Sequence, residues 1–452
     1  ASALDANTTG AANTAIGAAA LGAETTGVNN TAVGKDALLT QAGATGNTAV
    51  GKSAGDAITT GSNNTVVGLD AGGALTTGAS NVAVGKDALL VATTGAQNVA
   101  VGALALDAAT TAVDNTAIGY NALTAATTGV NNTGVGSGAL AAVTIATGNF
   151  VVGKDAANAL TTGVNNVAVG LDTLGAETTG INNTAIGKDA LLSQVGADGN
   201  VAIGNTAGDA LTTGSNNVAV GLNALSAATT AVHNVAVGKD ALLSSTTAVQ
   251  NTAVGALSGD ALTTGGDNVA VGYNALTGET TGVNNVAVGS GALSVQAGAN
   301  GNVAVGKDAG NALTTGVNNV AIGLVALGAE TTGTSNVAIG KDALLAHAGA
   351  IGNVAIGTAA GDALTTGANN VAVGLNALSA ATTGALNTAI GKDALLVATI
   401  AVNNTAIGAL SLTGATTGVD NTACGYNALA AVTTGVQNTA IGSGAGATIT
   451  TG

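Results

Sequence analysis

The chain has 452 residues and a formal net charge of -15, with 71 glycines and no proline, methionine or tryptophan. Hydrophobic residues make up 46% of it and charged residues 7%, and a chain so rich in aliphatic residues and so poor in charge is not typical of disorder. The acidic balance argues against partners such as nucleic acid or an anionic membrane surface. No apolar run approaches the roughly 18 residues that span a bilayer, so we expect no membrane segment in this chain.

An asparagine recurs every 17 residues from Asn13 to Asn438, 26 times without insertion or deletion, and a glycine follows each one four residues later. The repeated unit reads N-[TV]-A-[VI]-G-x-x-A-L-x-x-x-T-T-G-x-x, and we number its places from the asparagine. The run GYNAL returns at Gly119, Gly272 and Gly425, nine units apart, so the units are grouped in blocks of nine. We therefore interpret residues 1–452 as a single continuous repeat array. Both ends cut through a unit and no capping sequence is present, so we expect the array to be longer than this chain.

The first element of each unit is a β-branched run closed by a glycine, such as NTAIG from Asn115, which predicts a short strand. Side chains alternate across a strand, so the second and fourth places face one way and the third faces the other. None of these places carries a charge, and we expect both faces of the strand to be buried. The glycine at the fifth place is expected to make a turn after the strand, as at Gly17, Gly34, Gly51, Gly68 and Gly85.

The asparagine at the first place would form a ladder if successive units stack about 4.8 Å apart, each amide bonding to those above and below. The alternative is that asparagine merely tolerates a turn conformation. The ladder is favoured because aspartate and glycine would serve a turn equally well, and neither occurs at this place. The first seven predicted ladder residues are Asn13, Asn30, Asn47, Asn64, Asn81, Asn98 and Asn115.

Two later places exchange a large aliphatic side chain. In 18 units the ninth place is leucine; in the other eight it is glycine or alanine, and only there does the twelfth place become leucine or isoleucine. One aliphatic group per unit is thus predicted to fill one space in a closely packed core. Examples are Leu38 and Leu123 at the ninth place and Ile58, Leu75 and Leu211 at the twelfth. The TTG that follows, as at Gly163, is expected to bend the chain through a left-handed glycine.

Candidates for chemistry are few. Cys424 replaces a valine or isoleucine of the fourth place and is expected to be a buried, unreactive thiol. His233 and His347 occupy different places in their units, and we expect solvated histidines and not metal ligands. All nine lysines stand at the sixth place, where they are expected to keep an edge solvated. We therefore predict no catalytic, cofactor or metal site, and exposed rings at Tyr120, Tyr273 and Tyr426.

These residues predict an all-β fold, a parallel β-solenoid of 17-residue coils. So thin a coil is better stabilised if identical chains share a core, so we expect a homotrimer, with a filament as the alternative. The runs NTAIG and NVAVG, followed by small residues and a glycine turn, resemble the head repeats of trimeric autotransporter adhesins, whose characteristic run is close to N-S-V-A-I-G. They also resemble repeats of some phage tail fibres and bacterial surface fibres. The resemblance covers essentially the whole chain and implies a left-handed, trimeric β-roll, extracellular or at a cell or virion surface.

The function expected from both lines is a structural fibre or adhesin-like rod that gives length, stiffness and surface attachment, with any receptor bound outside this segment. An ice- or crystal-binding solenoid is a second possibility, but it would need a flat, uninterrupted threonine array. An enzyme on a β-helix scaffold is a third, but one unit would have to break the pattern and gather polar groups. None does, so we expect no enzymatic activity.

Overall fold

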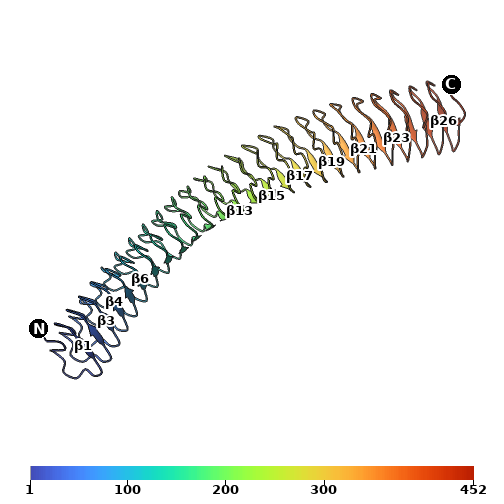
Figure 1. The fold of residues 1–452 in the computed structure, drawn as a ribbon. Coiled ribbons are helices and arrows are strands. Elements are labelled where there is room, and N and C mark those ends of the chain that lie inside the picture. Colours follow the sequence, from blue (N-terminus) through green and yellow to red (C-terminus); the bar gives the residue numbers. More distant parts are fainter. Residues whose placement is uncertain (1, 452) are drawn as a thin grey trace. The chain divides into compact units, whose positions relative to one another are not determined.

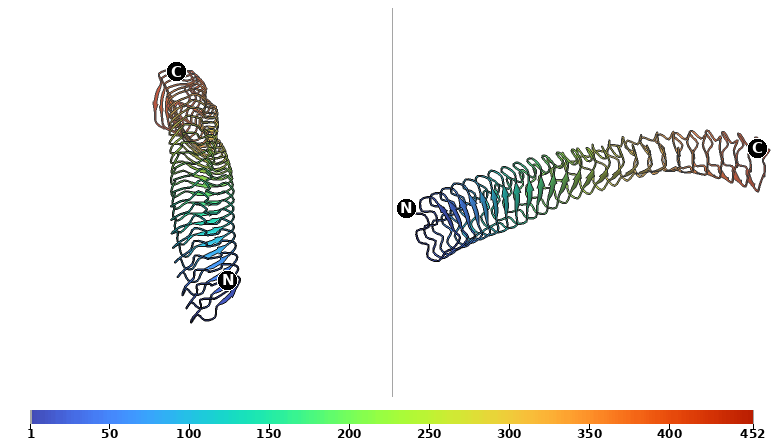
Figure 2. Two further views of the ribbon diagram at one scale, coloured as in Figure 1. Left: turned by 90° about the vertical axis from the view of Figure 1, so that its left-hand side faces the viewer. Right: turned by 60° about the horizontal axis from the view of Figure 1, so that its bottom comes forward.

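The computed structural model describes residues 2–451, which form an all-β parallel solenoid with one short strand in each 17-residue coil (Figures 1 and 2). This confirms the predicted fold class and repeat length. The chain divides into two compact units, one ending at Thr230 and the other beginning at Ala231. The described residues contain no helix, and hence none long and apolar enough to cross a membrane.

All strands occupy the second to fourth places of their coils. The first unit contains β1 (Thr14–Ile16), β2 (Thr31–Val33), β3 (Thr48–Val50), β4 (Thr65–Val67), β5 (Val82–Val84), β6 (Val99–Val101), β7 (Thr116–Ile118), β8 (Thr133–Val135), β9 (Phe150–Val152), β10 (Val167–Val169), β11 (Thr184–Ile186), β12 (Val201–Ile203) and β13 (Val218–Val220). The second unit contains β14 (Val235–Val237), β15 (Thr252–Val254), β16 (Val269–Val271), β17 (Val286–Val288), β18 (Val303–Val305), β19 (Val320–Ile322), β20 (Val337–Ile339), β21 (Val354–Ile356), β22 (Val371–Val373), β23 (Thr388–Ile390), β24 (Thr405–Ile407), β25 (Thr422–Cys424) and β26 (Thr439–Ile441).

Within each unit, consecutive strands pair in parallel and in register, so that every place of one coil lies beside the same place of the next. Thr31 pairs with Thr48 and Ala32 with Ala49 between β2 and β3, and the same pattern holds between β20 and β21. At about 4.8 Å per strand, the thirteen strands of one unit extend over about 60 Å. A repeat without insertions requires each place to pair with the same place of the next coil, because a shift of one residue in the strand pairing would move every side chain to a different environment.

The two faces of each strand differ, and the expectation that both are buried is wrong. The third place points into the coil and is buried, as at Ala32 and Ala100, whereas the second and fourth places are half-buried or exposed. Ile118 and Ile203 at the fourth place are each 39% exposed. The interior of the coil lies on one side of the strand only, so nothing from the same chain covers the other side.

Glycine stands at the fifth place of every unit and at the fifteenth place of most units, for different reasons. At the fifth place the backbone takes a positive φ, 143° at Gly34, and a Cβ there would lie 2.2 Å from the carbonyl oxygen of Gly51. At the fifteenth place the expected left-handed conformation is wrong, because Gly163 is not among the residues with positive φ. Close stacking favours glycine there instead, since a Cβ on Gly163 would lie 2.4 Å from the oxygen of Gly180. Alanine takes the same place in other units, as at Ala112.

The ninth-place leucines adopt an unexpected backbone conformation. Leu38 and Leu123 have φ values of 50° and 51°, in the left-handed region that costs an ordinary residue about 1–2 kcal/mol. This conformation directs the N–H of Leu38 to the oxygen of Ala54 in the next coil, at 3.1 Å, while the residue two places earlier donates to the preceding coil. Both side chains are fully buried, so packing and hydrogen bonding offset the strain.

The exchange between the ninth and twelfth places takes place in the interior. Ile58, Leu75 and Leu211 are buried like the ninth-place leucines. A Cβ on Gly55 would lie 2.8 Å from Cδ1 of Ile58 and 3.1 Å from Cδ2 of Leu38. The twelfth-place isoleucine therefore reaches the space beside the ninth place. Glycine at the ninth place also avoids the conformational strain that a leucine has in the left-handed region.

Moving the aliphatic group within one coil tests this account. Leu123→Gly should lower the free energy of unfolding by about 2–4 kcal/mol, because a buried side chain is lost. Adding Ala126→Ile reproduces the Gly55 and Ile58 pair and should restore more than half of that loss. Denaturant titrations of the two single variants and the double variant measure the coupling. A double variant no more stable than Leu123→Gly would contradict a shared space.

Candidate functional site

The first-place asparagines form a buried polar column in each unit. Oδ1 of Asn47 accepts the backbone N–H of Asn64 at 2.8 Å and its side-chain amide at 3.2 Å. Nδ2 of Asn64 donates to the oxygen of Gly78 at 3.0 Å, across its own coil. Asn30, Asn81, Asn98 and Asn115 repeat the N–H contact to Oδ1. The amide thus closes one coil and joins it to the next, and its partners are backbone groups as well as other side-chain amides.

Four coils contain a second buried polar group that the sequence analysis missed. All four glutamates of the chain stand at the twelfth place and are fully buried: Glu24, Glu177, Glu279 and Glu330. Oε1 of Glu24 accepts the N–H groups of Thr26 at 3.0 Å, Gly27 at 2.6 Å and Gly43 at 2.9 Å. Backbone donors therefore satisfy the charge in place of a cation.

The next coil supplies a matching side chain, at the same twelfth place. Nε2 of Gln41 donates to Oε2 of Glu24 at 2.7 Å, and its Oε1 accepts Nδ2 of Asn47 at 2.9 Å. Gln194 makes the same two contacts, to Glu177 and Asn200. We call each such pair of coils a carboxylate joint. In the Glu24 and Glu177 joints one glutamine connects the carboxylate to the asparagine column. In the third joint, Oε2 of Glu279 and Oε1 of Gln296 have no hydrogen-bond partner within residues 2–451.

His347 takes the glutamine's place in the fourth joint, and the expectation that it is solvated is wrong. Its ring is fully buried; Nδ1 contacts Oε2 of Glu330, and Nε2 lies 2.9 Å from Nδ2 of Asn353. A pattern in the sequence indicates this pairing of glutamate with glutamine or histidine. Each glutamate is followed 17 residues later by glutamine or histidine, and each time TTG is replaced by a run with glycine at the fourteenth place, as at Gly43 and Gly349.

Burial alone would raise the pKa of Glu330, but the hydrogen bonds from His347 and from the N–H groups of Gly333 and Gly349 outweigh it. Together they lower the pKa from 4.5 to about 2. The pKa of Glu24 is also lowered: its burial is outweighed by the Gln41 side chain and by three backbone N–H groups.

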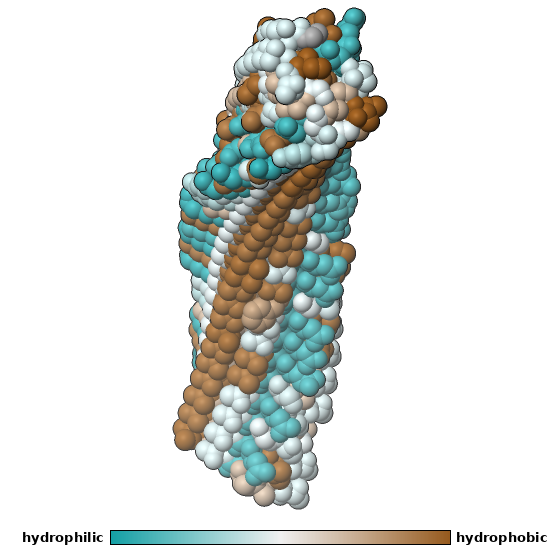
Figure 3. All heavy atoms as spheres, turned by 90° about the vertical axis from the view of Figure 1, so that its right-hand side faces the viewer, coloured by the Kyte–Doolittle hydropathy of each residue, from teal (hydrophilic) through white to brown (hydrophobic). Residues whose placement is uncertain are grey.

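The outward side of the strands is an apolar surface, which we call the strand face and define as the second and fourth places of all coils. The second place is threonine or valine except at Phe150, and the fourth is valine or isoleucine except at Cys424. Figure 3 shows hydrophobic side chains gathered in a stripe along successive coils. No charged residue interrupts either column. Cys424 is half-exposed, so the expectation of a buried thiol is wrong.

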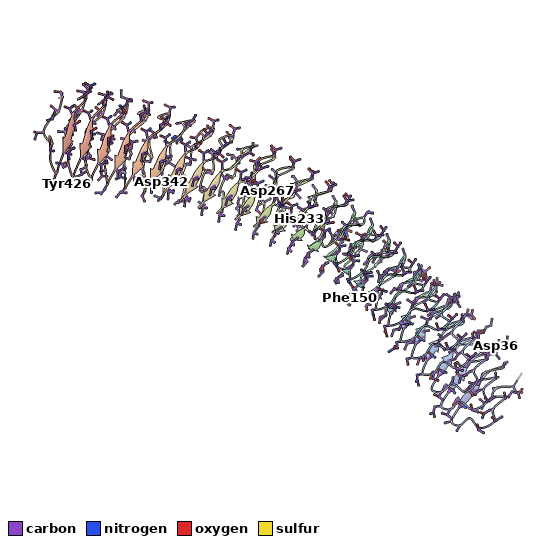
Figure 4. All side chains as sticks on the ribbon, turned by 180° about the vertical axis from the view of Figure 1, so that it is seen from behind. Asp36, Phe150, His233, Asp267, Asp342 and Tyr426 are labelled. Atoms are coloured by element: carbon purple, nitrogen blue, oxygen red, sulfur yellow. The ribbon has the colours of Figure 1, made fainter. Side chains whose placement is uncertain are left out.

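Charged and aromatic side chains lie beside this face. Lys35 and Lys154 pair with the aspartates that follow them, at 3.0 and 2.7 Å, and most other lysines do the same. Tyr120, Tyr273 and Tyr426 are more than half exposed. Phe150, His233 and Tyr426 are exposed on the outside of their coils (Figure 4). These lysine–aspartate pairs leave little uncompensated positive charge next to the strand face.

The residues 2–451 contain no pocket and no cluster of three potential metal ligands. Comparison with known families finds no family model that matches the chain, and no curated protein of similar sequence is found. The candidate functional features are therefore the buried polar columns and the strand face.

The asparagine column can be tested by one nearly isosteric change. Asn115→Asp places an oxygen where Nδ2 now donates to the oxygen of Gly129, at 2.8 Å. An unpaired buried charge should lower the free energy of unfolding by about 3 kcal/mol or more at pH 7. Part of this loss should return below pH 4, where a protonated carboxyl can donate. Urea titrations at both pH values check it, and a neutral effect at pH 7 would contradict the column.

The lowered pKa of Glu330 has a defined consequence for stability. A carboxyl whose pKa is lower in the folded state stabilises the protein above its unfolded value of 4.5, and that contribution disappears as the pH falls toward 2. Unfolding midpoints should therefore fall more steeply between pH 5 and 2.5 in the natural chain than in a Glu330→Gln variant. Asp114→Asn, on the surface, is the control. Equal pH dependence in all three chains would refute the stabilised carboxylate.

Proposed function

We propose that this chain is a structural fibre segment, extracellular or on a cell or virion surface, that provides length, stiffness and surface attachment. The observation that carries the proposal is the repetition of one coil, with the same strand and the same asparagine contacts, through residues 2–451. We assign no catalytic role, because the side chains of the asparagine column are bonded to each other and to the backbone.

We further propose that three copies pack through their strand faces around a shared core. This face is apolar, uncharged and formed by rigid β-branched side chains, and no part of the described chain covers it. Burying the exposed third of a valine or isoleucine contributes about 0.5–1 kcal/mol. The thirteen strands of one unit then contribute on the order of 10 kcal/mol to association, which is comparable with the entropic cost of bringing the copies together. The strands of both units together exceed that cost.

The resemblance to adhesin heads and tail-fibre repeats adds two features to the proposal, a left-handed course of the coils and an adhesive role at a surface. Any receptor-binding part is assigned to a region outside this segment. A filament of copies is the alternative assembly.

An ice- or crystal-binding surface is a second candidate, because one observation favours it. The fourteenth place presents exposed threonines on successive coils, at Thr60, Thr77, Thr94, Thr111 and Thr128. Their spacing of about 4.8 Å is regular. Gly43 and Ile145 interrupt the row on either side, so it is shorter than the strand face.

The assembly is tested by mass and by cross-linking. Sedimentation equilibrium should give three times the chain mass of 41.6 kDa. Because Cys424 lies in the strand face, a short bis-maleimide should join copies covalently at sub-micromolar concentration. The double variant Cys424→Val/Thr434→Cys moves the thiol to the exposed fourteenth place of the same coil and should not cross-link. A stable monomer would contradict the shared core and favour the ice-binding candidate, whereas an indefinitely large species would indicate a filament.

A further inference from the structure

In the fourth carboxylate joint a titratable imidazole stands where the Glu24 and Glu177 joints have the neutral amide of a glutamine. The coils involved are residues 319–335, which contain Glu330; 336–352, which contain His347; and 353–369, which begin at Asn353. Each makes the same column contacts as its counterparts elsewhere.

The column fixes the orientation of the Asn353 amide. Its Oδ1 accepts the backbone N–H of Asn370 at 2.9 Å and the side-chain amide of Asn370 at 3.0 Å. Its Nδ2 donates to the oxygen of Gly367 at 2.9 Å. Turning the amide over would place oxygen against oxygen and nitrogen against nitrogen at these contacts, so the group next to His347 is an N–H donor.

This orientation determines the tautomer of His347. Facing a donor, Nε2 must accept and therefore carries no hydrogen, so Nδ1 carries the hydrogen and donates to Oε2 of Glu330. A neutral imidazole in this form has one donor and one acceptor in the positions that Gln41 fills with Nε2 and Oε1. Histidine can thus replace glutamine at this joint only while it is neutral.

We propose that the Glu330–His347 pair is a pH-sensitive joint: protonation of His347 at Nε2 breaks its contact with Asn353 and loosens the coils 336–369, while the Gln41 and Gln194 joints stay closed. An added hydrogen at Nε2 points at the N–H of Asn353, where there is no acceptor. Turning Asn353 to offer its oxygen would lose the contacts to Gly367 and Asn370. The hydrogen bond to Asn353 is lost in either case.

The charges around the joint support a local effect. Glu330 is the only charged residue of its coil. Its carboxylate is the charged group that contacts the His347 ring. In the coil of His347, Lys341 and Asp342 pair with each other at 3.1 Å. The following coil contributes only Asp362, which is half-buried at the tenth place. The carboxylate of Glu330 attracts a protonated ring, but it does so through Nδ1 and provides no acceptor at Nε2.

Hydrogen exchange in the intact protein tests the proposal with an internal control. Peptides covering 347–353 should lose about tenfold or more of their protection between pH 7.5 and pH 5, after correction for intrinsic exchange. Peptides covering 194–200, the Gln194 joint, should keep theirs. His347→Gln copies the natural glutamine joints and should abolish the difference. Unchanged or increased protection at 347–353 at pH 5 would overturn the proposal.

The tautomer gives a second, independent readout. The chain has two histidines, so selective 15N labelling of histidine resolves both rings. At pH 7.5 His347 should show a protonated Nδ1 and an unprotonated Nε2, whereas His233, exposed on the surface, serves as the solvated reference. A ring protonated at Nε2 at this pH would overturn the proposed geometry even if the exchange data agreed.

Discussion

The hydrogen bond between the Oδ1 of one asparagine and the backbone N–H of the asparagine 17 residues later is the interaction on which the remaining structure depends. The side-chain nitrogen of the asparagine closes the coil by donating to the carbonyl oxygen of the fifteenth place, as Asn64 does to Gly78. One side chain therefore fixes both the length of a coil and its position above the next. Aspartate keeps the acceptor but loses the donor, and glycine loses both, which explains why neither replaces the asparagine in any unit.

Close stacking constrains the other places in turn. The carbonyl oxygen that receives the asparagine amide lies close to the preceding coil, so that a Cβ on Gly61 would lie 2.2 Å from the oxygen of Gly78. This place is glycine in most units and alanine in the others. Where the fourteenth place changes to glycine, at Gly43, its N–H reaches back to the carboxylate of Glu24. The buried carboxylates and the asparagine column are therefore compatible in one coil, because the carboxylates accept backbone N–H groups of the same turn that the asparagine closes.

Much of this fold could be predicted from the sequence, because a repeat without insertions reveals register and coil length directly. The strands at the second to fourth places and the buried third place follow from the alternation of small and β-branched residues. Left-handed leucines such as Leu38 could not be predicted, since their conformation is set by hydrogen bonds to neighbouring coils and not by local preference. The exposure of the strand face was also missed, because apolar composition does not distinguish a core from a surface that another chain could cover.

The carboxylate joints show a different limit. The burial of His347 could not be predicted from that residue alone, because its partner, Glu330, stands at the same place in the preceding coil. Comparing each place between successive coils would have paired all four glutamates with their partners. In a stacked repeat, the relevant neighbour of a residue is 17 positions away, so single-position exceptions need to be examined in pairs.

The most direct test of the asparagine column is the hydrogen exchange of asparagine side-chain amides, followed by NMR after selective 15N labelling of asparagine. The account predicts two classes. The first-place amides, buried and bonded as in Asn81 and Asn98, should exchange slowly, while exposed amides such as those of Asn29 and Asn63 should exchange at nearly the rate of free asparagine. A single class of rapidly exchanging amides would contradict the column and the stacking that depends on it.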